Sequence, residues 1–144
     1  MFSQRVRLVM ERKRLLTASP ETTVSKAAAR MARRQVGAIL IMENKQLIGI
    51  FTERDAVFRV IARGLDAKTT RLAEVMTTSP QTIDPDKSFG YALLLMHEKG
   101  FRHVPVLENG SLVGIVSARN ALDPDMEEFA AESQRRKQIL RERE

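Results

Sequence analysis

The chain has 144 residues, 43% of them apolar and 29% charged, which is enough to bury a core in one compact domain or in two small halves. It has no cysteine and only two histidines, and this composition excludes a disulfide framework, a thiolate zinc site and a cysteine nucleophile. The formal net charge of +6 favours anionic partners, and we expect a cytoplasmic protein without a membrane span, because no apolar run approaches the ~18 residues that a span requires.

The first predicted elements form a unit of strand, helix, hairpin and helix. After a helical segment at residues 6–16, a short strand ends at Ser19-Pro20. Apolar residues at helical spacing between Val24 and Met31 predict a helix with one buried face. Residues 37–51, GAILIMENKQLIGIF, predict a two-stranded hairpin, and a second helix begins near Glu53.

The same unit returns 65 residues later. Residues 17–56 align with residues 82–121 without a gap, and 11 of the 40 aligned pairs are identical. In the second copy a strand ends at Asp84-Pro85, Asn109-Gly110 marks the hairpin turn, and the last helix begins near Ala118. A fixed period of this length indicates two copies of one supersecondary structure.

We therefore predict an α+β fold of two β-α-β-β-α repeats, packed with pseudo-two-fold symmetry around a cleft and flanked by N- and C-terminal helices. Residues 1–66 hold an N-terminal segment and the first repeat, residues 67–126 hold a linker and the second repeat, and residues 127–144 form a charged C-terminal helix or tail. The polar segment from Ala62 to Leu72 is the predicted linker.

Motifs at matching places in both copies carry a resemblance to a known family. They are the lead-in segments LVMERK (8–13) and EVMTTSP (74–80), the strand FRHVPV (101–106), and the hairpin ends GIFTERD (49–55) and GIVSARN (114–120). From about Val6 to Leu122 the chain resembles a pair of cystathionine β-synthase (CBS) domains, the Bateman module. The resemblance implies a stand-alone regulatory protein, not an enzyme, that binds an adenine nucleotide (AMP, ADP or ATP) in the cleft and signals to a protein partner. It also implies a homodimer, and no other cofactor is expected.

The resemblance further implies that Thr52 and Asp55 bind the phosphate and the ribose of the ligand. An ionised carboxylate accepts through two oxygens, so Asp55 suits two neighbouring ribose hydroxyls, while the amides at a helix start favour phosphate. The ribose and phosphate side of this preferred site is predicted to comprise Thr52, Arg54, Asp55, Arg102, His103 and Arg119. Its adenine side is predicted to comprise Phe101 and the strand SPQT, which is Ser79, Pro80, Gln81 and Thr82.

A second site is expected at the pseudo-symmetric position, built from Leu16, Thr17, Val36, Ser117 and Asn120. Asn120 lacks the second acceptor oxygen of a carboxylate. Gly37 and Ala38 stand where the second repeat has Arg102 and His103, so the first repeat supplies no basic side chain there. The sequence therefore predicts that this second site is weak or vacant.

Some of these residues also have a purely structural interpretation. Thr52 and Asp55 fit a helix capping box, which is compatible with ribose binding. Gly49 and Gly114 fit close packing at least as well as ligand approach. His97 is expected on the surface, and the methionines at apolar positions are expected in the core: Met10, Met31, Met42, Met76 and Met96.

Other functions stay open beside nucleotide sensing. The repeat is also compatible with a ligand-independent dimerisation scaffold, and S-adenosylmethionine offers the same ribose diol as the nucleotides. A nucleic-acid partner is disfavoured, since the chain has one tyrosine and no tryptophan for base stacking. Catalysis is not expected, because no phosphate-binding loop or serine-histidine pairing is present. The predicted subunit interface lies on the helices that begin near Glu53 and Ala118, through Ala56, Val57, Val60, Ile61, Ala121 and Leu122.

Overall fold

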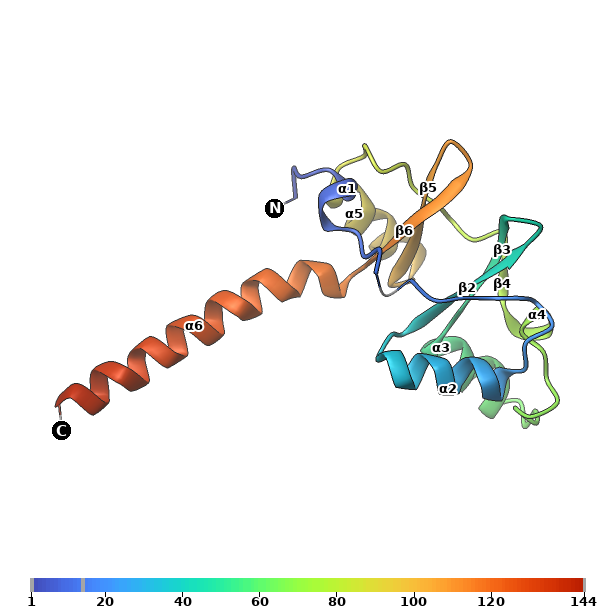
Figure 1. The fold of residues 1–144 in the computed structure, drawn as a ribbon, viewed down its shortest axis with the longest axis horizontal. Helices are drawn as coiled ribbons and strands as arrows, with labels where there is room; N and C mark the ends of the chain where they lie inside the picture. Colours follow the sequence, from blue (N-terminus) through green and yellow to red (C-terminus); the bar gives the residue numbers. More distant parts are fainter. Residues whose placement is uncertain (1, 14, 144) are drawn as a thin grey trace.

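The computed structural model describes residues 2–13 and 15–143, with the backbone alone for residues 122–127. The first repeat holds β1 (Thr17–Ala18), α2 (Val24–Arg34), β2 (Ala38–Glu43), β3 (Gln46–Thr52), the one-turn helix α3 (Glu53–Asp55) and the π-helix η1 (Ala56–Ile61). The second repeat holds α4 (Leu72–Val75), β4 (Thr77–Thr78), α5 (Phe89–Lys99), β5 (His103–Glu108), β6 (Ser111–Ser117) and α6 (Arg119–Arg143), and α1 (Val6–Val9) precedes both. The predicted α+β fold of two repeats is confirmed, and Figure 1 shows them as two lobes.

Each repeat is built around an antiparallel hairpin covered by a helix. β2 and β3 pair from Ala38↔Thr52 to Glu43↔Gln46, and β5 and β6 pair from His103↔Ser117 to Glu108↔Ser111. The second hairpin turns at Asn109-Gly110, where both residues have positive φ, as the turn type requires. The predicted hairpin turn is therefore confirmed.

The covering helices begin and end where their capping residues predict. The side chain of Thr23 accepts a hydrogen bond from the Lys26 amide at the start of α2, and the side chain of Ser88 accepts one from the Tyr91 amide at the start of α5. α5 ends at Gly100, whose φ of 76° lies in the left-handed region that glycine favours. Local sequence thus sets the length of both helices.

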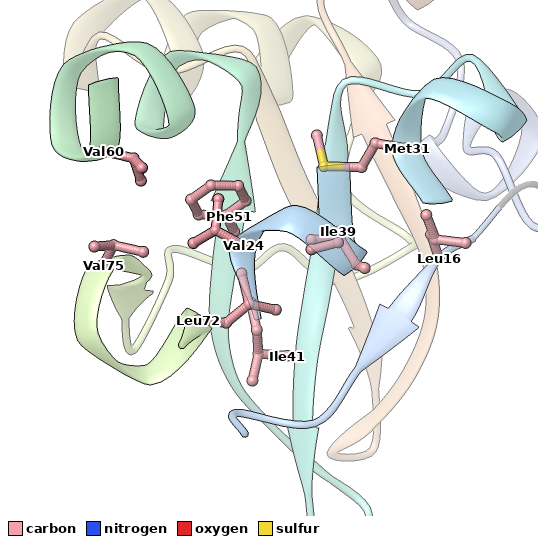
Figure 2. Packing of buried hydrophobic residues seen from close by; sticks show 10 residues of the cluster. Leu16, Val24, Met31, Ile39, Ile41, Phe51, Val60, Leu72 and Val75 are labelled. Carbon is pink, nitrogen blue, oxygen red and sulfur yellow. The ribbon is translucent and has the colours of Figure 1, made fainter. Parts of the chain in front are cut away.

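Two separate apolar cores lie under these helices. The first core, drawn in Figure 2, holds Leu16, Val24, Ala27, Met31, Ile39, Ile41, Phe51, Val60, Leu72 and Val75. The second core holds Val6, Met10, Ile83, Phe89, Ala92, Met96, Val104, Val106 and Val116. A third, smaller cluster around Ala38, Leu40 and Ile50 contacts Leu112 and Ile115 of the other repeat, so it joins the two halves.

Each lead-in segment pairs with the hairpin of the other repeat. β4 pairs with β3 through Gly49↔Thr78 and Ile50↔Thr77, while Glu11 bridges to Ile115 on β6. A Cβ atom at Gly49 would lie 2.4 Å from the sulfur of Met76. A Cβ atom at Gly114 would lie 2.8 Å from the sulfur of Met10. The interpretation of both glycines as close-packing residues is confirmed.

The N-terminal segment packs on the second repeat. The amide of Val6 donates to the carbonyl of Lys87 at 2.8 Å, and Val6 is fully buried in the second core. The guanidinium of Arg7 pairs with the carboxylates of Glu108 and Asp86. In Figure 1 α1 lies beside α5 accordingly. The first residues of the chain therefore complete the second repeat rather than the first.

Several predictions about local structure are corrected. The helix expected at residues 6–16 is limited to Val6–Val9. The strand expected to end at Asp84-Pro85 shrinks to one bridge, Ile83↔Val106. The SPQT segment is not a strand, because Ser79 has a φ of 47° and Pro80 has no amide hydrogen to pair. Proline and left-handed backbone stop strand pairing just after β4.

The two helices predicted near Glu53 and Ala118 are both present, but they differ in form. The first is one α-turn followed by the π-helix η1, and the second, α6, runs without a break from Arg119 to Arg143 as a long arm (Figure 1). The prediction that Val60 lies at a subunit interface is wrong, because Val60 is buried in the first core. The side chain of Leu122, predicted at the same interface, lies outside the described residues. Among the helices described, none is long and apolar enough to cross a membrane.

Candidate functional site

A cavity of about 220 Å³ lies between the two repeats, where the end of β6 faces the connection from α2 to β2. From the first repeat it is lined by Leu15, Leu16, Gln35, Val36, Gly37, Ala38, Leu40 and Glu53. From the second repeat it is lined by His103, Ile115, Ser117, Arg119 and Asn120, and Glu11 of the lead-in segment completes it. The lining combines apolar side chains with polar and charged ones, and both repeats contribute to each kind.

The cavity brings together residues from both predicted sites. It takes His103 and Arg119 from the preferred set, and it takes Leu16, Val36, Ser117 and Asn120 from the second set. The remaining predicted residues do not line this cavity: Thr17, Thr52, Arg54, Asp55, Arg102, Ser79, Pro80, Gln81, Thr82 and Phe101. The space found here therefore belongs to the position that the sequence ranks second.

At the edge of the cavity, Asn120 is held by the end of β6. Its Oδ1 accepts a hydrogen bond from the Ser117 amide at 2.7 Å and one from the Ser117 hydroxyl at 3.3 Å. Both bonds use the carbonyl oxygen, so the carboxamide nitrogen of Asn120 is the group that it can offer to a ligand. An amide donor at this place suits the oxygen of a hydroxyl or a phosphate.

The matching element of the first repeat is a complete capping box. The Asp55 carboxylate accepts from the Thr52 amide at 2.9 Å, and the Thr52 hydroxyl accepts from the Asp55 amide at 3.3 Å. The other carboxylate oxygen of Asp55 lies 3.5 Å from Nε of Arg59, and Asp55 is only 9% exposed. The capping interpretation is confirmed, whereas the role of Asp55 in ribose binding stays a prediction.

Two predicted phosphate-binding arginines have other surroundings. The Arg54 guanidinium lies over the ring of Phe58, 5.2 Å from its centroid. Arg102 is exposed, and its carbonyl accepts a hydrogen bond from the Ala118 amide. Neither side chain reaches the cavity.

The floor of the cavity depends on a glycine. A Cβ atom at Gly37 would lie 2.6 Å from a carboxylate oxygen of Glu53 and 3.4 Å from Nε2 of His103. The bare backbone of Gly37 therefore lets these two side chains meet beside it. Burial lowers the pKa of His103; the Glu53 carboxylate opposes this shift, and the Arg102 guanidinium adds to it. The imidazole is therefore neutral at pH 7.

The charged lining was only partly foreseen from the sequence. Glu53 and Glu11 were not predicted as site residues, although Glu53 lies inside the TERD motif itself. Its position in the second repeat is Ala118, and this difference was the available signal. Within the described parts of the chain, no three histidine, aspartate or glutamate side chains lie close enough to hold a metal ion.

Comparison with known proteins agrees with the fold. A model of the CBS domain family matches the chain twice, at residues 6–62 and 72–125. CBS domain-containing protein CBSCBSPB2 of Arabidopsis thaliana is 39% identical over 108 residues, which cover 74% of this chain and 20% of the relative. CBS domain-containing protein YhcV of Bacillus subtilis is 38% identical over 101 residues, which cover 70% of this chain and 71% of the relative. The chain spans about a fifth of the length of the Arabidopsis relative and of a Schizosaccharomyces pombe relative that it also matches.

Solved structures give the same result. An uncharacterized conserved protein from Pyrococcus horikoshii has a TM-score of 0.80 and 27% identity, with 87% of this chain and 94% of that chain covered. A hexameric CBS-CP12 protein from bloom-forming cyanobacteria has a TM-score of 0.76 and 27% identity, with 83% and 70% covered. The CBS domain protein PAE2072 from Pyrobaculum aerophilum, solved in complex with AMP, has a TM-score of 0.73 and 25% identity, with 81% and 89% covered. The chain is a tandem pair of CBS domains and belongs to the CBS domain family.

Proposed function

We propose that this CBS pair binds an adenine nucleotide between its repeats and passes the state of the ligand to a protein partner, without catalysis of its own. The observation that carries the proposal is the cavity at the end of β6, whose lining combines apolar side chains with Asn120, His103 and Arg119. The AMP bound to the structurally similar PAE2072 supports the same class of ligand.

The lining residues suit different parts of such a ligand. Leu16, Val36 and Leu40 supply apolar surface for the adenine ring. Asn120 and Arg119 also line the cavity. In the proposed complex the Asn120 amide donates to a ribose hydroxyl, and the Arg119 guanidinium supplies positive charge for phosphate. A phosphate next to His103 would favour the protonated imidazole and so raise its pKa.

The carboxylates limit how much negative charge the cavity can accept. Glu11 and Glu53 both line it, against one arginine and a histidine that is neutral at pH 7. Like charges at close range repel, and they do so most strongly where solvent is excluded. We therefore place AMP ahead of ADP and ATP among the nucleotides.

The site around Asp55 is kept as a second binding position, with Arg102 for phosphate and the SPQT segment and Phe101 for adenine. Its carboxylate is the better partner for a ribose diol. A ligand there must compete with Arg59, which lies 3.5 Å from Asp55. The geometry thus favours the Asn120 cavity, and the residue chemistry favours Asp55.

One observation favours a different ligand of the same class. The sulfonium of S-adenosylmethionine is a cation, and Glu11 and Glu53 offer it two carboxylates. A ligand-independent scaffold would bind neither this compound nor a nucleotide.

Self-association is the second part of the proposal. Val57, Phe58 and Ile61 of η1 expose large apolar side chains on one side of the first repeat. We assign this surface to a homodimer contact. Ala56 and Ala121, also predicted in the interface, are partly buried against the first and the second core respectively. Sedimentation of the purified chain at micromolar concentration checks it, since a monomer would contradict it.

Isothermal titration of the purified chain with AMP, ADP, ATP and S-adenosylmethionine tests the ligand. We expect AMP to bind with one ligand per chain, and Asn120→Ala to weaken binding by about tenfold or more, which corresponds to about 1.4 kcal/mol. The matched control is Asp55→Ala. If Asp55→Ala abolishes binding and Asn120→Ala leaves it unchanged, the ligand lies at Asp55. If none of the four compounds binds, the scaffold function replaces the sensor.

A further inference from the structure

The imidazole of His103 lies in the cavity without a hydrogen-bond partner. The side chain is partly buried, and among the residues that the structure describes no group forms a hydrogen bond with its ring. Histidine is also the only residue type in the cavity lining that titrates near neutral pH. The ring is therefore able to form a hydrogen bond with a ligand and to change its charge when it does so.

The Glu53 carboxylate meets this ring beside Gly37. One carboxylate oxygen lies 2.6 Å, and Nε2 of His103 lies 3.4 Å, from the point where a Cβ atom of Gly37 would stand. The Glu53 amide donates to the Gly37 carbonyl at 3.1 Å, so the backbone fixes the start of α3 at this place. Because both side chains reach the same point, a proton on the imidazole would lie next to a carboxylate, which favours the charged ring.

The charges around His103 oppose each other. Burial lowers the pKa of the ring, the Glu53 carboxylate on α3 opposes this shift, and the guanidinium of Arg102, just before β5, adds to it. The lead-in segment contributes the carboxylate of Glu11 to the cavity, and the start of α6 contributes the guanidinium of Arg119. Carboxylates and guanidinium groups thus act in opposite directions, and burial decides in favour of the neutral ring. A ligand that brings negative charge shifts this balance towards the charged ring.

We propose that His103 takes up a proton from solvent when a nucleotide phosphate binds in this cavity, so that pH is a second signal to which the CBS pair responds. This inference rests on the proposed function, because it requires the phosphate to lie towards His103 and Arg119. A phosphate monoester has its second pKa near ~6, so at pH 7 it enters mainly as a dianion and brings more negative charge than the single Glu53 carboxylate.

The affinity for AMP then depends on pH in one direction. At pH 7 the ring is neutral in the free chain and charged in the complex, so a fall in pH favours the complex. Uptake of about half a proton to one proton makes the dissociation constant about three- to tenfold lower at pH 7 than at pH 8. Below pH ~6 the gain ends, because the phosphate itself becomes protonated.

The chain has only two histidines, which gives this proposal a matched control. His97 is exposed on α5 and does not line the cavity, so His97→Gln leaves His103 as the only imidazole. We would titrate the full chain, His97→Gln and His103→Gln with AMP at pH 7 in buffers of different ionisation enthalpy. The slope of the binding enthalpy against the ionisation enthalpy of the buffer gives the number of protons taken up per AMP. About half a proton to one proton is expected for the full chain and for His97→Gln, and about none for His103→Gln.

A second measurement does not depend on a change at His103. In His97→Gln the remaining imidazole gives a single ring Cε1–H signal in the NMR spectrum, and titration of this signal with pH gives the pKa of His103. The pKa should lie below its ordinary value in the free chain, because the ring is buried, and it should rise when AMP is added. An unchanged pKa with AMP at saturation would overturn the inference.

The outcomes separate this inference from the function on which it rests. AMP that binds without proton uptake, or with equal uptake in His103→Gln and His97→Gln, would overturn the inference and leave nucleotide binding in place. If the full chain bound no AMP, the proposed function would fail and the inference would fail with it.

Discussion

The two hairpins end in closely related sequences but use them differently. In the first repeat, Thr52 and Asp55 form a reciprocal capping box, and the second carboxylate oxygen of Asp55 faces Arg59. In the second repeat, Asn120 accepts from Ser117 through one oxygen and lies beside a cavity. Both side chains accept from the amide and the hydroxyl three residues earlier, so the difference lies in their surroundings: Asp55 also contacts Arg59, whereas Asn120 lines the cavity.

Small residues across the cleft explain where that space lies. Gly37 and Ala38 face the end of β6, and the absent side chain of Gly37 leaves room for Glu53 and His103. The first repeat thus contributes to the cavity through the missing side chain of Gly37 as well as through its lining residues. A comparison of the two repeats by substitution should separate residues that stabilise the fold from residues of the proposed ligand site.

The largest effect is expected from the two buried phenylalanines, one in each core. Phe51→Ala and Phe89→Ala should each lower the free energy of unfolding by about 3–5 kcal/mol, because both side chains are fully buried. Urea unfolding followed by circular dichroism measures this. We expect one transition in both variants, since the cluster around Leu40 and Ile115 joins the repeats. Two separated transitions in either variant would show that the repeats unfold independently.

The close-packing glycines should give the next largest effect. Gly49→Ala and Gly114→Ala should each cost about 1–3 kcal/mol, as overpacked sites do. Gly49→Ala is expected to cost more, because its added Cβ would lie 2.4 Å from the Met76 sulfur, against 2.8 Å from the Met10 sulfur at Gly114. Thermal unfolding of the two variants checks this order of stability. If both variants melted at the same temperature as the unchanged chain, the prediction would be refuted.

The capping groups should show a smaller asymmetry in the same direction. Asp55→Ala should lower the free energy of unfolding by about 0.5–2 kcal/mol, since it removes half of a capping box. Asn120→Ala should cost less, because each variant removes the acceptor of one amide and one hydroxyl, but only Asp55→Ala also removes an ion pair, the one with Arg59. Urea titration of both variants measures the difference. A larger loss in Asn120→Ala would mean that the second hairpin end is the more important structural element.

The smallest effect is expected from the protonation of His103. Its pKa is lowered in the folded chain because the imidazole is buried, so the unfolded chain takes up the proton first as pH falls. Stability from this group is present above pH ~6.5 and is lost as pH drops below that value towards the lowered pKa. Between pH 7.5 and 5.5 the unchanged chain should therefore lose more stability than His103→Gln. If the stability of the unchanged chain and of His103→Gln depended on pH in the same way, His103 would not be the group responsible for this loss.

Much of the fold follows from the sequence because its signals are local or periodic. The offset of 65 residues gave the repeat, and Asn109-Gly110 gave the second turn. The exchange of β4 and of the segment at Glu11 was not predictable in this way, because each pairing involves only one or two residues far apart in the chain. The burial of Val6 in the second core was not predictable for the same reason, because it depends on contacts with residues far away in the chain.

The candidate site was less predictable than the fold. Residue chemistry ranked the Asp55 site above the Asn120 site, because a carboxylate has two acceptor oxygens and because Arg102 and His103 have no basic counterpart in the first repeat. Whether a cavity exists depends instead on packing across the cleft, to which Gly37 contributes by having no side chain. Glu53 illustrates the same limit, since its place in the cavity follows from the approach of two distant segments.

A crystal structure of the chain grown with AMP would test the central claim most directly. We predict density for one nucleotide in the cavity at the end of β6, with its ribose beside Asn120 and its phosphate towards Arg119 and His103. A nucleotide bound only beside Asp55, or a cleft without nucleotide at saturating AMP, would contradict this account.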